Sequence, residues 1–500
     1  METIFYKLIY DKQLKRSLNI LEILYKAKHA VTMKELQEKL NISLKSVLPS
    51  LEFTKTLLPD NIELTVSEKI VSLHQHDTSQ PIDSALIEIA KSTIPYQILK
   101  HIFYDGDILI AELAEMLFVS ESSLRIYIKH MNRTMTFFGL SISFRDVKLL
   151  GDETNIRYFF YAYFSEFQEL FVSVCADELE YFSGLYKNMR KMQLEYDDKL
   201  IHYSYQQISR WLFIVRDRLE LGKFVSVKKS LAKRIQSHPS FKNFKDIYES
   251  EITKTLTSPN IPISEVIWAY VVSFNSIIYT NDKNHLLYHD KLDSKSCQNK
   301  LAAVLKNVIN TLGVNDEDYE DFFAIHMAYL LNLSLLTEIS PIFQLGSDSI
   351  KNYVAGNLEY LYTTWLGALN RLQHDKIFTI TNSHSIASQL AMISSQFIYR
   401  QKTQVKKILF SFEGESGFAV YLETLAKTLV PEGVEALFVY NEPINSKTIE
   451  KTKPDIFVCN YQVNEKFDNC KMLRLSYVPL TQEWKLLKEL IINPNWHSFL

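Results

Sequence analysis

Glycine and proline are scarce in this chain, which has 12 glycines and 13 prolines among 500 residues. Average proteins contain about 7% glycine and about 5% proline, so this composition disfavours turn-rich β folds and nucleotide sites built on glycine loops. The four cysteines form no C-x-x-C pair and no ligand spacing with histidine. We therefore expect a mainly α, multidomain protein in a reducing compartment, with no metal site, no disulfide framework and no cofactor.

The chain also shows no secretory leader and no long apolar segment. Its first residues, METIFYKLIYDKQLKR, have neither an apolar core nor a cleavage site. Apolar runs such as 266–279 are too short or too polar to span a bilayer. The net charge of -3 is close to neutral, so any contact with nucleic acid must come from local basic stripes. We expect a cytoplasmic protein with no membrane partner.

One segment, residues 110–138, has the layout of a DNA-reading helix-turn-helix. Its first part, Ala111 to Leu117, carries apolar residues at helical spacing and predicts a supporting helix. Ser120 is a good helix cap, so a reading helix is predicted from there to about Phe138. Phe118 occupies the turn position where glycine is usual, and it could strain or reshape the turn.

The predicted reading helix has two different faces. The apolar positions that can face the supporting helix are Leu124, Ile128 and Met131. The cations that recur every four residues on another face are Arg125, Lys129 and Arg133. Residues 122–145 contain no Asp or Glu, so attraction to phosphates is the simplest use of this stripe. A charged outer face is also common on helices that bind nothing.

A second copy of this layout lies nearer the N-terminus. It comprises a first helix from Ser17 to Ala27, a capping-box pair formed by Thr32 and Glu35, and the turn Asn41-Ile42-Ser43. The reading helix that follows contains Pro49, which we expect to kink or shorten it. The next segment, IELTVSEKIVSL, alternates apolar and polar residues and predicts a two-stranded wing. Two winged helix-turn-helix units in tandem indicate a transcription regulator.

The rest of the chain changes character twice. Amphipathic helical patterns rich in Tyr and Phe fill residues 170–282 and 284–401, which predicts two helical bundles. From Lys406 onward strands alternate with helices, which predicts a small α/β domain with a mainly parallel sheet. The first loop of this domain contains Glu413 and Glu415, whose charges would repel a phosphate.

This order of segments resembles the Mga family of virulence regulators from Gram-positive bacteria, over essentially the whole chain. Two motifs are also similar to that family: LLGDETNIRYFFYAYF after the second wing and KILFSFEGE at the start of the last domain. The resemblance implies winged helix-turn-helix units at 1–77 and 78–165, helical domains similar to PTS-regulation domains at 166–283 and 284–402, and an EIIB-like α/β domain at 403–500.

The resemblance further implies a DNA-binding regulator, more often an activator than a repressor, that forms homodimers or larger oligomers. Phosphocarrier proteins of the sugar phosphotransferase system would tune it by phosphorylating histidines, each adding about two negative charges to a helix. In the first helical block Ser209 stands where the family pattern has histidine, and His202 is the local substitute. In the second block His326, within FFAIHMAYLL, is the best phosphoacceptor candidate, and His384 is a third.

An enzymatic role is disfavoured by the last domain. EIIB components carry their phosphate on a cysteine at the end of the first strand, and Phe412 occupies that position here. We therefore expect no catalytic residue. An RNA-binding antiterminator stays an alternative, although it would need a small β-rich domain at the N-terminus. A phosphotransfer component is a weaker alternative, because both Phe412 and Ser209 replace phosphoacceptors.

The predicted DNA contacts combine the basic stripe with the resemblance. They are Ser122, Ser123, Arg125, Lys129 and Arg133 in the second helix-turn-helix, with Lys45, Ser46 and Ser50 in the first. The second helix-turn-helix has the denser row of cations, so we expect it to supply most of the affinity for double-stranded promoter DNA.

Overall fold

The structure is a computed structural model, and helices form most of it, as the composition predicts. It describes residues 3–27, 30–67, 70–75, 89–166, 203–253, 260–279, 295–314, 316–374, 379–398, 407–415, 417–430, 434–442, 444–463 and 470–492, with 187, 256, 465 and 467. Two compact units are present. Compact unit 1 comprises residues 1–151, 163–171 and 445–500, and compact unit 2 comprises residues 152–162 and 172–444.

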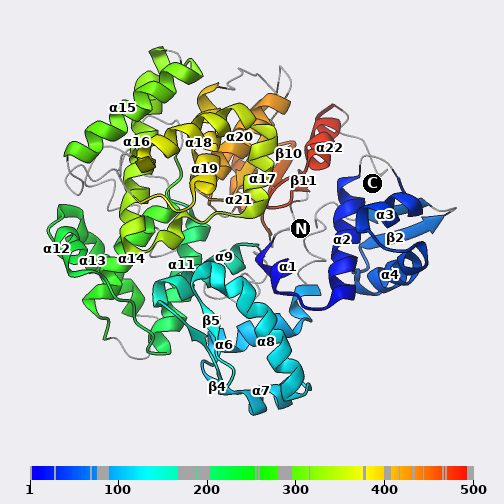
Figure 1. Ribbon diagram of the computed structural model, residues 1–500. Helices are drawn as coiled ribbons and strands as arrows, with labels where there is room; N and C mark the ends of the chain where they lie inside the picture. The colour runs from blue at the N-terminus through cyan, green and yellow to red at the C-terminus, as the bar shows by residue number, and fades with distance from the viewer. Residues whose placement is uncertain are drawn as a thin grey trace. The chain divides into compact units, whose positions relative to one another are not determined.

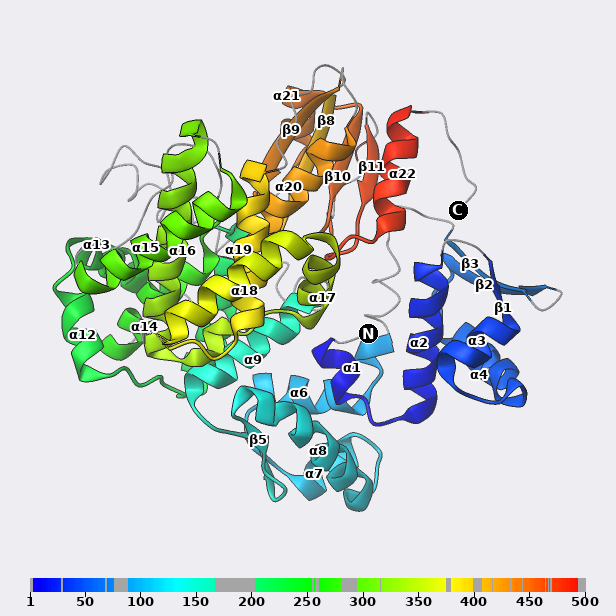
Figure 2. The same ribbon diagram turned by 45° about the horizontal axis from the view of Figure 1, so that its top comes forward.

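The first helix-turn-helix forms as predicted. Its elements are α1 (Ile4–Leu8), α2 (Lys12–Lys26), β1 (Val31–Thr32), α3 (Met33–Leu40), α4 (Leu44–Leu57), β2 (Ile62–Ser67) and β3 (Ile70–Gln75). Thr32 and Glu35 form the predicted capping box, and Asn41 ends α3 in the left-handed conformation with φ 50°. Strands β2 and β3 pair in antiparallel register to make the wing (Figure 2). Fully buried apolar side chains from the helices and the wing join in one core: Ile20, Leu36, Val47, Leu51 and Val71.

The expected shortening of α4 at Pro49 is wrong. The helix continues through this proline for a total of 14 residues. Pro49 lies near the helix start and is exposed, and the backbone acceptor that loses its partner belongs to Lys45, which is exposed as well. Water can hydrogen-bond to a carbonyl in such a position, so the proline costs less there than in a buried helix interior.

The second helix-turn-helix is also present in compact unit 1. Its helices are α6 (Ile94–Tyr104), α7 (Ile110–Met116), α8 (Glu121–Met135) and η1 (Thr136–Phe138). Its short strands are β4 (Ile108–Leu109), β5 (Ser141–Ile142), β6 (Asp146–Val147) and β7 (Leu149–Leu150). β5 pairs with β7 in a hairpin, and β6 pairs with β4, both antiparallel. The labels of α6, α7, α8, β4 and β5 mark this region in Figure 1.

The helical part of the chain confirms the two predicted helical regions. The helices of its first part are α9 (Glu153–Glu166), α11 (Tyr205–Glu220), α12 (Lys229–Gln236), α13 (Pro239–Ile252), α14 (Ile263–Ser273) and η3 (Phe274–Ser276). Those of the second part are α15 (Lys295–Leu312), α16 (Asp316–Ile339), η4 (Pro341–Gln344), α17 (Asp348–Asn357), α18 (Glu359–His374) and α19 (Ser383–Ile398). The boundaries predicted for the domains remain predictions.

Strands and helices alternate from Lys407 onward as predicted. They are β8 (Lys407–Phe412), α20 (Phe418–Leu429), β9 (Glu435–Tyr440), α21 (Ser446–Thr452), β10 (Ile456–Cys459), β11 (Lys471–Arg474) and α22 (Thr481–Ile492). The helix α21 is not among the elements expected from the sequence. Within compact unit 2, β8 pairs in parallel with β9. Within compact unit 1, β10 pairs in parallel with β11. The prediction of parallel strands is therefore confirmed for both pairs.

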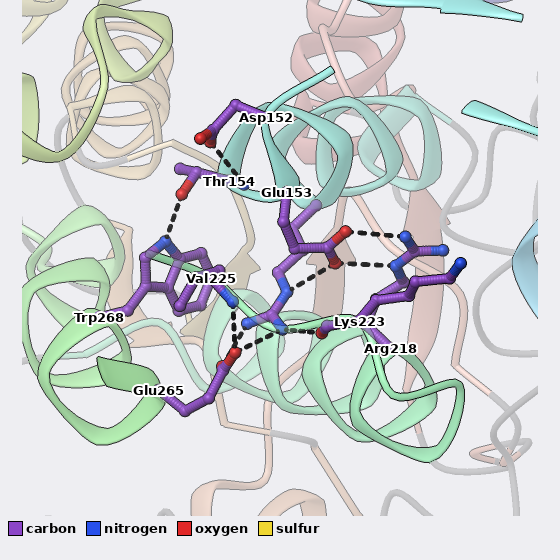
Figure 3. Close-up of polar contacts among 9 residues, drawn as sticks. Asp152, Glu153, Thr154, Arg218, Lys223, Val225, Glu265 and Trp268 are labelled. Carbon is purple, nitrogen blue, oxygen red and sulfur yellow. Dashed lines mark hydrogen bonds and ion pairs between the residues drawn. The ribbon is translucent and has the colours of Figure 1, made fainter. Parts of the chain in front are cut away.

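A buried ion network connects α9 to α11 and α14 within the first helical part. The guanidinium of Arg157 lies 2.7 Å from Glu265 Oε2 and 3.1 Å from Glu153 Oε1, and both Arg157 and Glu265 have no exposed surface. Glu153 also accepts two hydrogen bonds of 2.8 Å from Arg218, and Figure 3 shows these two side chains facing each other. Each charge in this network has at least one opposite charge within hydrogen-bonding distance, which is the condition for burying ions.

Backbone and aromatic groups complete the network. Glu265 accepts a 2.6 Å hydrogen bond from the backbone N–H of Val225, and the indole N–H of Trp268 donates to Thr154 at 3.0 Å (Figure 3). The Arg157 guanidinium also lies 4.9 Å from the centre of the Trp268 ring, within range of a cation–π interaction. Through Lys223 and Val225, the segment after α11 is thereby hydrogen-bonded to Arg157 of α9 and to Glu265 of α14.

One described helix is long and apolar enough to cross a membrane by length and composition, namely α16. Our expectation that no run meets this criterion is wrong for that helix. Of its most apolar window, 72% is buried inside the protein. The core helix of a helical bundle passes the same test, and α16 packs against α14, α15 and α19.

Candidate nucleic-acid interface

The turn of the second helix-turn-helix has a phenylalanine at its left-handed position. Phe118 adopts the left-handed conformation with φ 54°. The backbone N–H groups of Phe118 and Val119 donate to the carbonyls of Glu115 and Ala114, at 3.1 and 3.0 Å, which closes the end of α7. The Phe118 side chain is 97% exposed, so it gains no burial in return for the strained backbone.

Ser120 caps the reading helix α8 as predicted. Its Oγ accepts a 3.1 Å hydrogen bond from the backbone N–H of Ser123, which satisfies one of the free donors at the helix start. The hydroxyls of Ser122 and Ser123 each lie 2.9 Å from the same Oγ. Ser122 is exposed and Ser123 is half-buried. The three hydroxyls therefore form one cluster at the positively polarised end of α8.

Helix α8 divides into the two predicted faces. Leu124, Ile128 and Met131 have no exposed surface, which confirms the predicted inner face. Arg125, Lys129 and Arg133 are exposed on the outer side. At a rise of about 1.5 Å per residue, the first and last of these cations stand roughly 12 Å apart along the helix, which is enough to follow several phosphates of one strand.

Arg125 has two partners near the start of α8. Its guanidinium lies 3.7 Å from the Glu121 carboxylate, one turn earlier, and donates a 3.2 Å hydrogen bond to the carbonyl of Phe144. Both members of the ion pair are about half exposed, so the pair is weak and a phosphate could replace the carboxylate. Arg125 is thereby held between the reading helix and the tip of the β5–β7 hairpin.

Asn132 attaches this hairpin to α8. Its side-chain amide donates to the carbonyl of Ile142 at 3.0 Å and accepts from the N–H of Ile142 at 2.5 Å. One side chain thus takes the place of a neighbouring strand and sets where the hairpin lies against the reading helix. No local sequence pattern indicates this role of Asn132, because the role depends on a hairpin that folds back from ten residues further along the chain.

In the first helix-turn-helix, fewer of the predicted DNA-contacting side chains are exposed than expected. Lys45 is exposed, and Ser46 is half-buried with its hydroxyl 2.8 Å from that of Ser43. Ser50 is only 2% exposed, and it donates to the carbonyl of Ser46 and accepts from Arg16 at 3.2 Å. The predicted DNA contact at Ser50 is therefore corrected: the helix turns this side chain inward against α2.

The best histidine candidate, His326, is fully buried. Its Nδ1 donates to the carbonyl of Phe322 at 2.7 Å, and its Nε2 lies 2.9 Å from the Ser394 hydroxyl. Its ring stacks near Trp365, with centroids 5.1 Å apart. Burial lowers the pKa of His326 to about 4 from 6.5. In the described conformation both ring nitrogens are occupied, and a phosphodonor has no access to either of them.

The other two histidine candidates differ in their situations. His384 is exposed, and its Nδ1 lies 2.5 Å from the hydroxyl of Tyr362. His202 lies outside the described residues. Ser209, at the position where the family pattern has histidine, is fully buried in α11. Of the candidates in the described part of the chain, His384 is the one that solvent reaches.

The end of β8 is built as core. Phe412 has no exposed surface, and its ring lies 5.6 Å from that of Phe410. Cys459, at the end of β10, is also fully buried, and burial raises the pKa of its thiol to about 12. A thiol with such a pKa is not ionised near neutral pH and is a poor nucleophile.

The loop after β8 carries its two carboxyl groups inward. Glu413 is 1% exposed and lies 3.1 Å from the Arg210 guanidinium of α11. Glu415 is half-buried and accepts a hydrogen bond from the side-chain amide of Gln389. Burial raises the pKa of each carboxyl to about 7. The predicted repulsion of a phosphate by this loop is therefore reduced by Arg210 at one of the two carboxylates.

The comparisons with known proteins agree with this architecture. Residues 80–164, which contain α6 to α8 and the hairpin, match the family model described as the Mga helix-turn-helix domain. The chain is 22% identical over 421 residues to the capsule synthesis positive regulator AcpA of Bacillus anthracis, covering 81% of this chain and 84% of that protein.

Two further similarities cover shorter stretches. A protein of Streptococcus pneumoniae described as a trans-acting regulator is 29% identical over 159 residues, 32% of each chain. The capsule synthesis positive regulator AcpB of Bacillus anthracis is 25% identical over 147 residues, 29% of this chain and 30% of that protein. Together with the helix-turn-helix geometry, these similarities define a transcription regulator. Residues 80–164 match the helix-turn-helix domain of the Mga family, and the similarity to AcpA extends over most of the chain.

Proposed function

We propose that this regulator binds double-stranded promoter DNA mainly through α8, with Arg125, Lys129 and Arg133 on the phosphates of one strand. The observation that carries the proposal is the exposure of these three cations on a helix whose opposite face is fully buried. Ser122 and Ser123 lie at the end of α8 that would approach the duplex first, and they contact phosphates or base edges there. In the first helix-turn-helix, Lys45 and Ser46 add a smaller contribution.

The direction of regulation follows from the relatives. AcpA and AcpB are named as positive regulators, so we propose activation rather than repression for this chain. Reading a bacterial promoter requires a cytoplasmic location. Self-association into a homodimer or a larger oligomer is also part of the proposal, as the resemblance to the Mga family implies.

Regulation through the phosphotransferase system is the finer part of the proposal. Among the described candidates, His384 is the site that a phosphocarrier protein can reach without a conformational change. His326 becomes a phosphoacceptor only after its helix opens, because both of its ring nitrogens are engaged. Phe412 and the buried thiol of Cys459 support a non-catalytic role for the C-terminal strands and helices.

The decisive experiment measures duplex binding across a salt series. Replacing Arg125, Lys129 and Arg133 by alanine removes three phosphate contacts, and each contact contributes about 0.9 to the slope of log K against log salt concentration. We expect the slope of the variant to be smaller by about 2.7 and most of the affinity to be lost. Fluorescence anisotropy of a labelled mixed-sequence duplex gives both quantities.

A matched control removes the same charge elsewhere. Lys228, Lys229 and Lys233 are exposed at and within α12, so their replacement by alanine changes the net charge equally. We expect this control variant to bind with the affinity and slope of the unaltered chain. If both variants lose the same affinity, the loss is explained by the lower net charge and not by contacts of α8. An unchanged salt slope in the α8 variant would contradict the assignment of phosphate contacts to Arg125, Lys129 and Arg133. Tighter binding of a single-stranded RNA would support an antiterminator instead.

A further inference from the structure

Compact unit 2 contains a cavity that the function of DNA binding does not use. Its empty volume is about 600 Å³, which includes the open mouth. Residues far apart in the sequence line it, from α9, α11, α16, α19 and the loop after β8. This volume counts open solvent at the mouth as well as enclosed space, so it is an upper limit, and a bound molecule would fill the enclosed part and extend into the mouth.

The wall of the cavity is polar and aromatic. Four tyrosines contribute to it, Tyr158, Tyr161, Tyr279 and Tyr329. Amide side chains also contribute, among them Gln207 and Asn332. Burial raises the pKa values of all four tyrosines, so their hydroxyls stay protonated at neutral pH and can both donate and accept hydrogen bonds.

One lining group has an unused hydrogen-bonding position. Gln207 is 2% exposed, and its Nε2 donates to the carbonyl of Gly414, which fixes the orientation of the amide. Its Oε1 is buried and has no hydrogen-bond partner among the described residues. A buried carbonyl without a hydrogen-bond partner raises the free energy of the folded protein. A ligand that donates a hydrogen bond to it would remove this penalty.

The charge of the wall restricts the ligand. None of the described residues that line the cavity is Lys, Arg or His, so no cation is present to bind a phosphate or carboxylate. The one carboxyl group, Glu415, is already hydrogen-bonded by Gln389 and by the backbone N–H of Ser347. A ligand with many neutral hydroxyl groups matches a wall of amides, phenols and one carboxyl, and its C–H faces match the aromatic rings.

We propose that this cavity binds one neutral polyhydroxylated molecule of monosaccharide size, with Gln207 Oε1 accepting a hydrogen bond from a ligand hydroxyl and Tyr329 supplying a further hydroxyl contact. The bound molecule joins α9, α11, α16, α19 and the loop after β8, so it stabilises compact unit 2 as a whole. The proposal goes beyond DNA binding and does not depend on it.

The test uses the full chain and a defined set of probes. Thermal unfolding is measured with D-glucose, D-ribose, myo-inositol and N-acetylglucosamine, each from micromolar to millimolar concentration, and with inorganic phosphate and choline for comparison. A ligand that binds only the folded state raises Tm in a concentration-dependent way. We expect a saturable rise of several degrees for at least one of the four polyols and none for phosphate or choline.

Variants place the effect in this cavity. Gln207→Leu removes the unpaired acceptor, and Tyr329→Phe removes one lining hydroxyl while keeping the ring; each should weaken binding of the active polyol at least tenfold by titration calorimetry. Tyr248→Phe is the matched control, because that tyrosine is buried in the same unit but does not line this cavity. Circular dichroism checks that each variant is folded. If the Gln207→Leu variant does not fold, the Tyr329→Phe variant alone tests whether the ligand binds in this cavity.

Three results would overturn the proposal. They are the absence of a Tm shift with all four polyols, a shift that survives unchanged in Tyr329→Phe, and binding of choline or phosphate in place of the polyols. Choline binding would show that the aromatic rings and Glu415 form a cation site. Because duplex binding is measured separately with the α8 variant, failure of one proposal is distinguishable from failure of the other.

Discussion

Neutralising Glu265 should destabilise compact unit 2 far more than its small change in volume suggests. The Glu265→Gln variant keeps the shape of the side chain but leaves the buried guanidinium of Arg157 with Glu153 as its remaining carboxylate partner. Glu265 accepts hydrogen bonds from Arg157 at 2.7 and 3.1 Å and from the N–H of Val225 at 2.6 Å. The variant amide can still accept but brings an N–H₂ group into the same enclosed space.

The magnitude follows from the burial of the pair. Removing one charge of a buried ion pair costs about 3–5 kcal/mol, because the other charge is left without full compensation. With a urea m-value of about 3 kcal/mol per M, the unfolding midpoint should fall by about 1 M or more. Tryptophan fluorescence reports the transition, since Trp268 lies directly beside Arg157.

An exposed ion pair provides the comparison. Lys34 and Glu38 lie 4.0 Å apart on α3, with side chains 83% and 65% exposed. Glu38→Gln should change the unfolding free energy by less than about 1 kcal/mol. If Glu265→Gln shifts the midpoint no more than Glu38→Gln does, the buried network does not hold this region together. A double variant, Arg157→Met with Glu265→Gln, should cost less than the sum of its two single variants.

Two further predictions concern backbone strain and pH. Phe118→Gly should raise the unfolding free energy of the second helix-turn-helix by about 1 kcal/mol, because a left-handed non-glycine residue is strained and this ring buries almost nothing; lower stability in urea titration would contradict this. Burial raises the pKa of Glu415 to about 7 from 4.5, so its contribution to stability is complete below pH 4.5 and is lost as the pH rises through 7. Glu415→Gln should therefore flatten the fall in Tm between pH 5 and pH 8, whereas an unchanged slope would show that the residue does not titrate in that range.

The local features of the helix-turn-helix units could be predicted from the sequence. Capping at Ser120 and Thr32, the left-handed Asn41 and the inner face of α8 all depend on residues within one or two helical turns. Such short-range preferences act in almost any tertiary context. The C-terminal strands were equally clear, because each is a short apolar run between turn residues.

Features that depend on distant residues were missed or mistaken. Ser50 is a polar residue of the kind expected at an exposed helix position, yet Arg16 from another helix covers it. His326 matches a motif, and only the packing against Trp365 and Ser394 shows that it is enclosed. Glu265 pairs with a residue 108 positions away, and no local pattern indicates such a partner.

Phe412 has an evolutionary consequence. Its ring has no exposed surface and lies beside the rings of Phe410 and Phe438, with centroids 5.6 and 6.5 Å away. Exchanging a buried phenylalanine for a much smaller residue leaves a void, at a cost of about 3–5 kcal/mol for the extreme case of alanine. A single mutation of Phe412 to cysteine would thus weaken the core, and the new thiol would be buried and therefore unreactive. The neighbouring rings must change first, so a reactive thiol is difficult to acquire at this position.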